Sequence, residues 1–335
     1  MADEKNASEP GSGFLFAEEG LIPLEEGGDD RAGGHSFRRG EHGVERILAT
    51  ADGKAEFICH ADSVLTHIKS QMGYPAFYPL LPARLAPPVE AVLMDLDGTS
   101  VHSEDFWVWI IQQTVAALRK EPKFELEDAD LPFVSGHSVS EHLQYCLDKY
   151  CPAATVEEAR GHYFTITRRE MQEIIAGRGR PDAFQPTPGL KDFLFALKER
   201  GIKIGLVTSG LYEKAWPEIH AAFQQLEMGD PRDFYDAIIT AGYPLGQGET
   251  GTLGELEPKP HPWLYAETCR VGLGIDFSRR QHVVGIEDSG AGVLSIRLAG
   301  FTAIGLAGGN IQKSGAQALC SHFCPTLSSI LQIIT

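Results

Sequence analysis

The most constraining feature of the sequence is a regular alternation of short apolar runs and amphipathic stretches that begins near residue 89. Residues 91–94 form a short apolar run that ends abruptly at Asp95, which is typical of a strand buried on both faces of a parallel sheet. Residues 104–120 follow with apolar side chains at helical spacing, and helical sequence continues through 138–176. This order predicts an α/β fold.

The alternation resumes at Thr187, which suits a helix N-cap, with Pro188 at the first helical position and Gly201 at the end of the helix. The segments that complete the series are strands at 202–207, 235–240, 282–286 and 301–306 and helices near 262–272 and 290–299. Alternating strands and helices predict a doubly wound parallel sheet, in which ligands bind beyond the carboxyl ends of the strands.

The first 88 residues differ in composition from the rest of the chain. Residues 1–44 are rich in Gly, Glu and Asp, with nine acidic residues against one lysine in the first 30, and we expect a disordered acidic tail. Residues 45–88 regain apolar side chains, and those at 64, 65 and 68 lie at helical spacing, which predicts a helix. Because five prolines follow between residues 75 and 88, we interpret 45–88 as an N-terminal extension with a proline-rich linker.

The net charge of −17 over 335 residues limits the partners that this chain can bind. We expect no affinity for nucleic acid or for a membrane, and a phosphorylated substrate would need cations placed locally. No run is apolar and long enough to span a bilayer, no secretory signal is visible, and the six cysteines form no disulfide framework. We therefore expect a cytoplasmic protein, and the sequence leaves its oligomeric state open. The CSHFC segment at 320–324 lacks a second ligand pair nearby, so we expect it to be structural.

Two pairs of acidic residues stand at predicted strand ends. Asp95 and Asp97 flank one apolar residue directly after the first strand, and Glu287 and Asp288 follow the strand at 282–286. Paired carboxylates are costly unless a cation compensates them, and Mg²⁺ prefers such hard oxygen ligands. Each pair taken alone is also compatible with an ordinary turn before a helix.

A hydroxyl pair and a lysine lie between the two acidic pairs. Thr208 and Ser209 end the strand at 202–207, where hydroxyls and backbone N–H groups can hold phosphate oxygens. Lys259 stands between two prolines that restrict the backbone and would direct its ammonium group. A helix cap and an exposed loop lysine are the structural alternatives. The joint order of the four motifs, each at or near a strand end, predicts a single site.

These four motifs resemble the signature of the haloacid dehalogenase superfamily. They are most similar to the branch with a helical cap inserted soon after the first motif, which includes phosphosugar phosphatases and beta-phosphoglucomutase. The resemblance covers residues 89–335 and says nothing about residues 1–88. It implies a Rossmann-like catalytic core made of 89–101 and 185–335, with a helical cap at 102–184.

The resemblance also implies a role for each residue that handles the phosphoryl group. Asp95 matches the nucleophile, which forms a phospho-aspartate, and Asp97 matches the general acid/base. Thr208 and the backbone of Ser209 match the phosphate cradle. Lys259 matches the lysine that neutralises the nucleophile and the phosphate.

A magnesium site is implied in the same way. Asp288 matches the acidic ligand of Mg²⁺, and Glu287 would bind the ion directly or through water. The family's metal also takes a carboxylate oxygen of Asp95 and the backbone carbonyl of Asp97. We therefore expect a magnesium-dependent phosphatase that hydrolyses a small phosphate monoester, such as a sugar phosphate or a similar metabolite.

Several residues bear on the choice among family members. Asp97 favours phosphoryl transfer over dehalogenation, because haloacid dehalogenases proper lack an acid at that position. Beta-phosphoglucomutase carries a histidine where this chain has Trp107, and an arginine where it has Val139, so a hydrolase is favoured over a mutase. His102 and Ser100 also depart from the branch and leave the choice of substrate open. The alternatives are a phosphosugar mutase and an inactive binding module whose residues 1–88 face a partner. His102, His137 and His142 are candidates for substrate contact, with ordinary surface or helix-face histidines as the favoured alternative, and Trp107 is expected to pack within the cap.

We also expect residues 45–88 to pack on the core or the cap and to help define access to the site. The glycine-rich segment 242–257 is interpreted as a flexible surface loop before Lys259.

Overall fold

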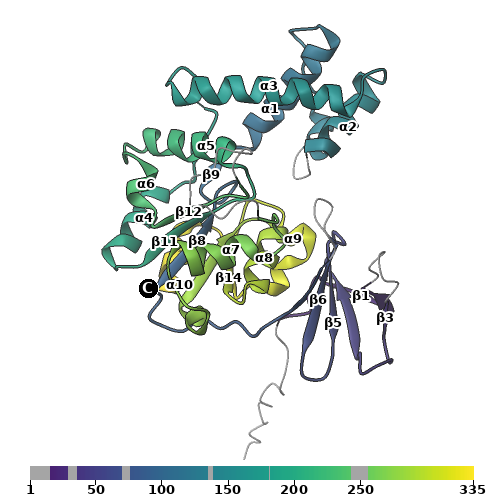
Figure 1. Cartoon of the computed structure of the whole chain (residues 1–335), viewed down its shortest axis with the longest axis vertical. Coiled ribbons are helices and arrows are strands. Elements are labelled where there is room, and N and C mark those ends of the chain that lie inside the picture. The colour runs from purple at the N-terminus through teal and green to yellow at the C-terminus, as the bar shows by residue number, and fades with distance from the viewer. Residues whose placement is uncertain (1–15, 29–35, 70–75, 135–138, 181, 243–255) are drawn as a thin grey trace, which may run out of the picture.

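The computed structural model describes residues 16–28, 36–69, 76–134, 139–180, 182–242 and 256–335. The described residues form a core built on a parallel sheet, a layer of helices above it, and a small antiparallel β unit beside it (Figure 1). Among the helices described, none combines the length and the apolarity needed to cross a membrane.

The core sheet confirms the predicted fold class. Within the described residues it has six strands in the order β12-β11-β8-β13-β14-β15, and every neighbouring pair is parallel. The strands are β8 (Ala91–Asp95), β11 (Lys203–Val207), β12 (Ala237–Ile239), β13 (Val283–Glu287), β14 (Thr302–Leu306) and β15 (His322–Cys324). Because β8 lies between β11 and β13, the strand that ends in Asp95 occupies the middle of the sheet.

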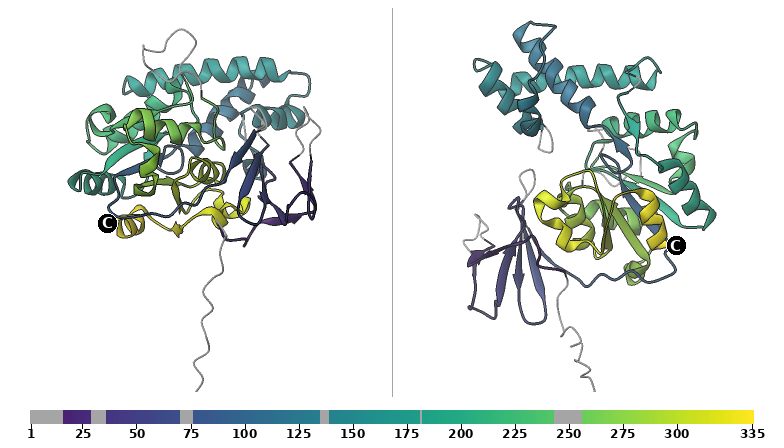
Figure 2. Two further views of the ribbon diagram at one scale, coloured as in Figure 1. Left: turned by 60° about the horizontal axis from the view of Figure 1, so that its bottom comes forward. Right: turned by 180° about the vertical axis from the view of Figure 1, so that it is seen from behind.

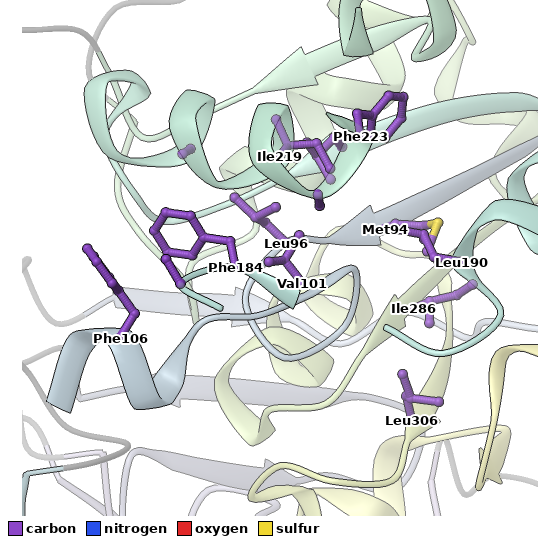
Figure 3. Packing of buried hydrophobic residues seen from close by; sticks show 14 of the residues in the cluster. Met94, Leu96, Val101, Phe106, Phe184, Leu190, Ile219, Phe223, Ile286 and Leu306 are labelled. Atoms are coloured by element: carbon purple, nitrogen blue, oxygen red, sulfur yellow. The ribbon is translucent and has the colours of Figure 1, made fainter. Parts of the chain in front are cut away.

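Helices cover both faces of this sheet. Val92 and Met94 of β8 point to one face, where they join an apolar cluster with α4, α5 and α10, and Figure 3 shows Met94, Leu190 and Ile286 meeting there. Ala91 and Leu93 point to the other face and join a cluster with α7 and α8. The core helices are α4 (Leu190–Glu199), α5 (Tyr212–Gln225), α6 (Pro231–Phe234), α7 (Trp263–Glu267), α8 (Gly290–Leu298), α9 (Ile311–Ser314) and α10 (Leu327–Ile334), with a π-helical turn at Thr268–Gly272 and 3-10 turns at Phe277–His282 and Ala316–Leu319.

Helix α4 begins later than the sequence predicts. Its N-cap is Gly189, in the left-handed region at φ 81°, and the Leu190 N–H donates to the Thr187 carbonyl oxygen at 3.0 Å. Thr187 and Pro188 therefore form the turn that precedes the helix, because the glycine accepts a conformation that strains other residues. Gly201 follows the helix with φ 68°, as expected for the end of a helix.

The second layer contains α1 (Glu104–Arg119), a 3-10 turn (Asp128–Phe133), α2 (Val139–Tyr150) and α3 (Val156–Ile175). These elements fall within the residues 102–184 that the resemblance assigns to a cap, and they lie above the core in Figure 1. The chain enters and leaves this layer through an antiparallel ribbon of β9 (Val101–His102) and β10 (Gln185–Pro186). Beside the ribbon, the rings of Phe106 and Phe184 lie 4.7 Å apart and continue the apolar core into the layer (Figure 3).

The N-terminal part of the chain is folded as a β unit, which corrects three expectations. Its strands, within the described residues, are β1 (Ile22–Leu24), β4 (Arg46–Ala49), β5 (Ala55–Cys59), β6 (Val64–Ile68) and β7 (Ala76–Pro79) in the antiparallel order β1-β4-β5-β6-β7, with a separate pair β2 (Glu26–Gly27) and β3 (Phe37–Arg38). The segment 64–68 is a strand rather than a helix, and 76–79 is a strand rather than part of a linker. The disordered tail predicted for 1–44 is wrong for the strands at 22–27 and 37–38, while 1–15 and 29–35 lie outside the described residues.

This β unit packs directly on the core. Phe57, Ile68 and Leu80 are buried in the same apolar cluster as Leu264 of α7 and Val293 of α8. The Ala51 N–H, in the turn between β4 and β5, also donates to the Ser314 carbonyl oxygen at 2.8 Å. Figure 2 shows from two further sides that the sheet lies against the part of the core that carries α8 and α9.

Candidate active site

The predicted site residues meet at the carboxyl edge of the core sheet. Residue Val207 of β11 pairs in register with Asp95 of β8, so Thr208 emerges beside the end of β8. Glu287 is the last residue of β13, the strand on the other side of β8. Parallel strands bring their carboxyl ends to the same edge, and this topology joins three segments that are far apart in the sequence.

Lys259 connects two of the acidic residues. Its Nζ donates to Asp95 Oδ1 and, at 2.5 Å, to Glu287 Oε1. The side chains of Lys259 and Asp95 are each 7% exposed and that of Glu287 is fully buried, so water screens these ion pairs little. Burial favours the neutral amine, but Asp95 and Glu287 outweigh it and raise the pKa of Lys259 above its ordinary value. Lys259 is therefore a permanent cation between two carboxylates.

Three carboxylates form a compact cluster at this point. Oxygen atoms of Asp95, Glu287 and Asp288 all lie within 4.8 Å of one another. Burial, followed by the Glu287 carboxylate, raises the pKa of Asp95 well above its usual range and that of Asp288 to about 8. One lysine cannot neutralise three carboxylates, and hard oxygen donors at this spacing fit a divalent cation such as Mg²⁺.

Two glycines confirm that the position of Asp288 is closely fixed. A Cβ at Gly98 would lie 2.1 Å from Asp288 Oδ2, and one at Gly309 would lie 2.4 Å from the same oxygen. Gly98 also has φ 82°, a conformation that other residues rarely adopt. The backbone of the Asp97-Gly98 dipeptide therefore lies against a carboxylate of the second acidic pair.

Asp97 lies in a different environment from Asp95. Its Oδ1 accepts a hydrogen bond from Ser103 Oγ at 2.7 Å, and its Oδ2 lies 3.5 Å from Thr208 Oγ1. Burial raises the pKa of Asp97, but the Lys214 ammonium at 3.9 Å and the Ser103 hydroxyl outweigh it, and the pKa falls below its ordinary value. The site thus holds two neighbouring carboxyl groups whose pKa values are shifted in opposite directions, the pattern of paired acid and base groups.

The two hydroxyl residues take separate positions. Thr208 is buried, and its Oγ1 accepts a hydrogen bond from the Gly210 N–H at 2.9 Å. Ser209 Oγ accepts a hydrogen bond from the Lys259 N–H at 3.1 Å. The Ser209 side chain therefore holds the backbone of the lysine, a contact that the sequence did not predict.

Helix α5 adds two residues that sequence reasoning missed. Lys214 Nζ lies 4.0 Å from the ring centroid of Trp107 and 3.9 Å from Glu218 Oε1. Glu218 is fully buried, and its carboxyl group interacts with Asp97, Lys214 and the indole N–H of Trp107. Burial and then Asp97 raise the pKa of Glu218 well above its usual range. The i, i+4 spacing of Lys214 and Glu218, directly after the Thr208 motif, was the signal available in the sequence.

Other sequence candidates lie apart from this cluster or outside the described residues. Trp107, expected to pack within the cap, also contacts Lys214. His102 is exposed and His142 is buried in α2. His137 and the glycine-rich residues 243–255 lie outside the described residues. The acidic cluster that fits a metal, within the part of the chain described, includes none of the residues of the CSHFC segment.

A comparison with protein families decides the class of this molecule. Residues 89–300 match the family of haloacid dehalogenase-like hydrolases. The chain belongs to this family. It is therefore a hydrolase of the haloacid dehalogenase type, as the four motifs predicted. A search among curated proteins finds none that matches the sequence.

Several solved structures share the fold. A predicted phosphoglycolate phosphatase from Haemophilus somnus aligns with a TM-score of 0.54 and 19% identity, over 74% of this chain and 99% of that chain. A predicted beta-phosphoglucomutase from Thermotoga maritima aligns with a TM-score of 0.52 and 19% identity, over 73% of this chain and 98% of that chain. A haloacid dehalogenase-superfamily hydrolase of subfamily IA from Geobacter sulfurreducens aligns with a TM-score of 0.51 and 15% identity, over 76% of this chain and 100% of that chain. These likenesses establish the fold, and the family match begins after the β unit.

Proposed function

We propose that this hydrolase is a magnesium-dependent phosphatase that cleaves a small phosphate monoester through a phospho-aspartate at Asp95. The observation that carries the proposal is the buried arrangement of Lys259 between Asp95 and Glu287, with Asp288 completing a cluster of three carboxylates. In this proposal Asp95, Asp288 and the backbone carbonyl of Asp97 would hold Mg²⁺, and Glu287 would bind it directly or through water. When bound, the ion supplies positive charge that balances the carboxylates and the phosphate.

The electrostatics of the site support attack by Asp95 on a phosphate. A carboxylate and a phosphate oxygen repel each other by about 4 kcal/mol per pair of unit charges at 4 Å and an effective dielectric near 20. Lys259 already contacts Asp95 and is almost fully buried, so its charge acts at nearly full strength on the reacting groups. Phosphoryl transfer needs little beyond such positioning and charge compensation. Formation of a covalent intermediate divides the reaction into two easier steps.

Asp97 is proposed as the general acid/base. Its lowered pKa makes it a carboxylate at neutral pH in the free protein, which is the form that accepts a proton from water in the second step. A dianionic phosphate beside it raises its pKa again and favours the protonated form that donates to the leaving oxygen in the first step. Ser103 and Thr208 restrict the orientation of its two oxygens.

Two residues of the helical layer, Trp107 and Val139, favour hydrolysis over the mutase alternative. The position of the mutase histidine is held by Trp107, whose ring contacts both Lys214 and Phe106. Val139, at the position of the mutase arginine, is the first residue of α2 and carries no charge for a second phosphate. The charged contacts among Asp95, Lys259 and Glu287 favour catalysis over a role as an inactive binding module.

Phosphate release from a panel of phosphorylated metabolites, with and without Mg²⁺, tests the proposal. We expect release on at least one compound with Mg²⁺, and its loss in Asp95→Asn. The matched control is Asp192→Asn, because Asp192 is an exposed acid in α4, on the face away from the apolar cluster. Release that persists in Asp95→Asn would contradict the nucleophile assignment, and isomerised sugar phosphates without free phosphate would favour the mutase.

A further inference from the structure

The β unit makes polar contacts, through Tyr78, with the segment that follows Lys259. The hydroxyl of Tyr78, in β7, lies 2.8 Å from His261 Nδ1, and the two rings meet edge to face with centroids 5.8 Å apart. The indole N–H of Trp263 also faces the Tyr78 oxygen. An indole nitrogen can only donate, so Tyr78 accepts from Trp263, which leaves its own O–H available to donate to His261 Nδ1. His261 is 2% exposed, and burial lowers its pKa, which favours the neutral imidazole.

His261 is separated from Lys259 by one proline, and this short segment is fixed at both ends. The Lys259 N–H donates to Ser209 Oγ at 3.1 Å, and the His261 carbonyl oxygen accepts from Ser295 Oγ at 2.5 Å. Ser209 and Ser295 both belong to the core. Tyr78 adds a contact to the His261 side chain from outside the core.

The same contact fixes the start of helix α7. Trp263 is the first residue of α7, and Tyr265 one half-turn later donates its hydroxyl to Glu287 Oε1 at 2.9 Å. The Tyr265 ring also lies 5.2 Å from Lys259 Nζ. Tyr78 therefore contacts the segment 261–263 between two residues, Lys259 and Tyr265, that hold the acidic cluster.

The β unit is itself rigidly placed, which a positioning contact requires. Its sheet shares a buried apolar cluster with α7 and α8, and the β4–β5 turn is hydrogen-bonded to Ser314. Tyr78 pairs with Thr66 across β6 and β7, so its backbone is held by the sheet. Residues 16–80 lie outside the family match at 89–300, so this contact is an addition to the family's core.

We propose that the β unit positions the catalytic lysine, and that Tyr78 is the positioning residue that acts through His261. The proposal rests on the proposed function for its kinetic consequence. It adds a role for the N-terminal residues, which hold the Lys259–Tyr265 segment in the geometry that contacts Asp95 and Glu287.

Tyr78→Phe tests the proposal because it removes the hydroxyl and keeps the ring. With p-nitrophenyl phosphate as substrate, we expect kcat to fall about tenfold and KM to change less than threefold, since a misplacement of about 1 Å costs up to ~100-fold. Hydrogen–deuterium exchange of the full-length protein without substrate should show faster exchange in the peptide 259–267. His261→Asn keeps an acceptor near the Nδ1 position and should retain more activity than His261→Leu. The double variant of Tyr78→Phe with His261→Leu should be no slower than His261→Leu alone.

Thr66→Val is the matched control. Thr66 lies directly across from Tyr78, is fully buried, and its hydroxyl finds no hydrogen-bond partner among the described residues, so valine should leave kcat and exchange unchanged. The proposal would be overturned if kcat and the exchange rate of 259–267 in Tyr78→Phe stayed within twofold of the wild-type values. It would also be overturned if Thr66→Val lowered kcat as much as Tyr78→Phe does. Absence of phosphate release by the wild-type protein from p-nitrophenyl phosphate and from every compound of the metabolite panel would refute the phosphatase proposal, while the exchange of 259–267 would still decide the role of Tyr78.

Discussion

The cluster of Asp95, Glu287 and Asp288 should make the metal-free protein less stable as the pH rises. Asp288 has an ordinary pKa of 3.8 and a pKa of about 8 in the folded chain. Between these values the folded protein holds a proton that the unfolded chain releases, so the free energy of unfolding falls as the pH rises through this window. Replacing Asp288 by Asn removes the charge that has to be neutralised and should flatten the dependence.

The size of the effect follows from the same two values. A pKa difference of one unit between the folded and unfolded states corresponds to about 1.4 kcal/mol of unfolding free energy, so the full difference for Asp288 amounts to at most about 6 kcal/mol. Asp95 and Glu287 share the repulsion, and a single substitution should recover about 2–3 kcal/mol of that total at pH 8 to 9. For a chain of this size about 1 kcal/mol shifts Tm by roughly 2 °C, so Asp288→Asn should melt about 4–6 °C above the wild type there.

Thermal unfolding between pH 5 and pH 9, in chelator and in Mg²⁺, measures this difference. In chelator the wild type and Asp288→Asn should melt close together near pH 5 and diverge above pH 7. In Mg²⁺ the order should reverse, because the ion stabilises the intact cluster and replaces its proton. Asp192→Asn, at an exposed site, should follow the wild type throughout. A wild-type Tm that stays level or rises from pH 5 to pH 8 in chelator would refute the reasoning, as would a parallel decline in Asp288→Asn.

Two further changes address the other groups of the site. Lys214→Gln removes the cation that lowers the pKa of Asp97. The acidic limb of the pH profile of kcat/KM should therefore move to higher pH, and kcat at pH 7 should fall about tenfold. A pH profile that superimposes on that of the wild type would count against a role for Lys214. Gly98→Ala should weaken Mg²⁺ binding, measured by calorimetry, at least about tenfold, because the new Cβ would meet the Asp288 carboxylate. Gly53→Ala, also at positive φ but with open space around it, measures the backbone strain alone and should bind Mg²⁺ as the wild type does.

The core could be predicted from the sequence because its signals are local. The apolar run before Asp95 and the helix-ending Gly201 each depend on neighbours in the sequence, and parallel strands then bring the motifs to one edge. The roles of the motif residues came from a family resemblance and remain proposals. The geometry adds the contacts among Lys259, Asp95 and Glu287.

The β unit could not be predicted because its stability is not local. The apolar residues at 64, 65 and 68 fit a helix and a strand equally well, and the choice is made by pairing with β5 and β7. Pro79 occupies the last position of β7, where the missing N–H removes little stability from the sheet. The contact between Tyr78 and His261 joins residues 183 positions apart, and a single sequence gives no sign of such a pair.

The ribbon of β9 and β10 has a consequence for the timing of the reaction. Ser103 follows β9 directly, is the N-cap of α1, and donates to Asp97, while Trp107 one turn later covers Lys214. A rotation of the helical layer about the ribbon would therefore withdraw a hydrogen bond from Asp97, the proposed acid/base group, and uncover Lys214 beside it in one movement. Under the proposed mechanism, the groups that transfer the proton would be complete only when the layer rests on the core, so an open molecule would admit substrate or release phosphate without exposing a working acid to bulk water.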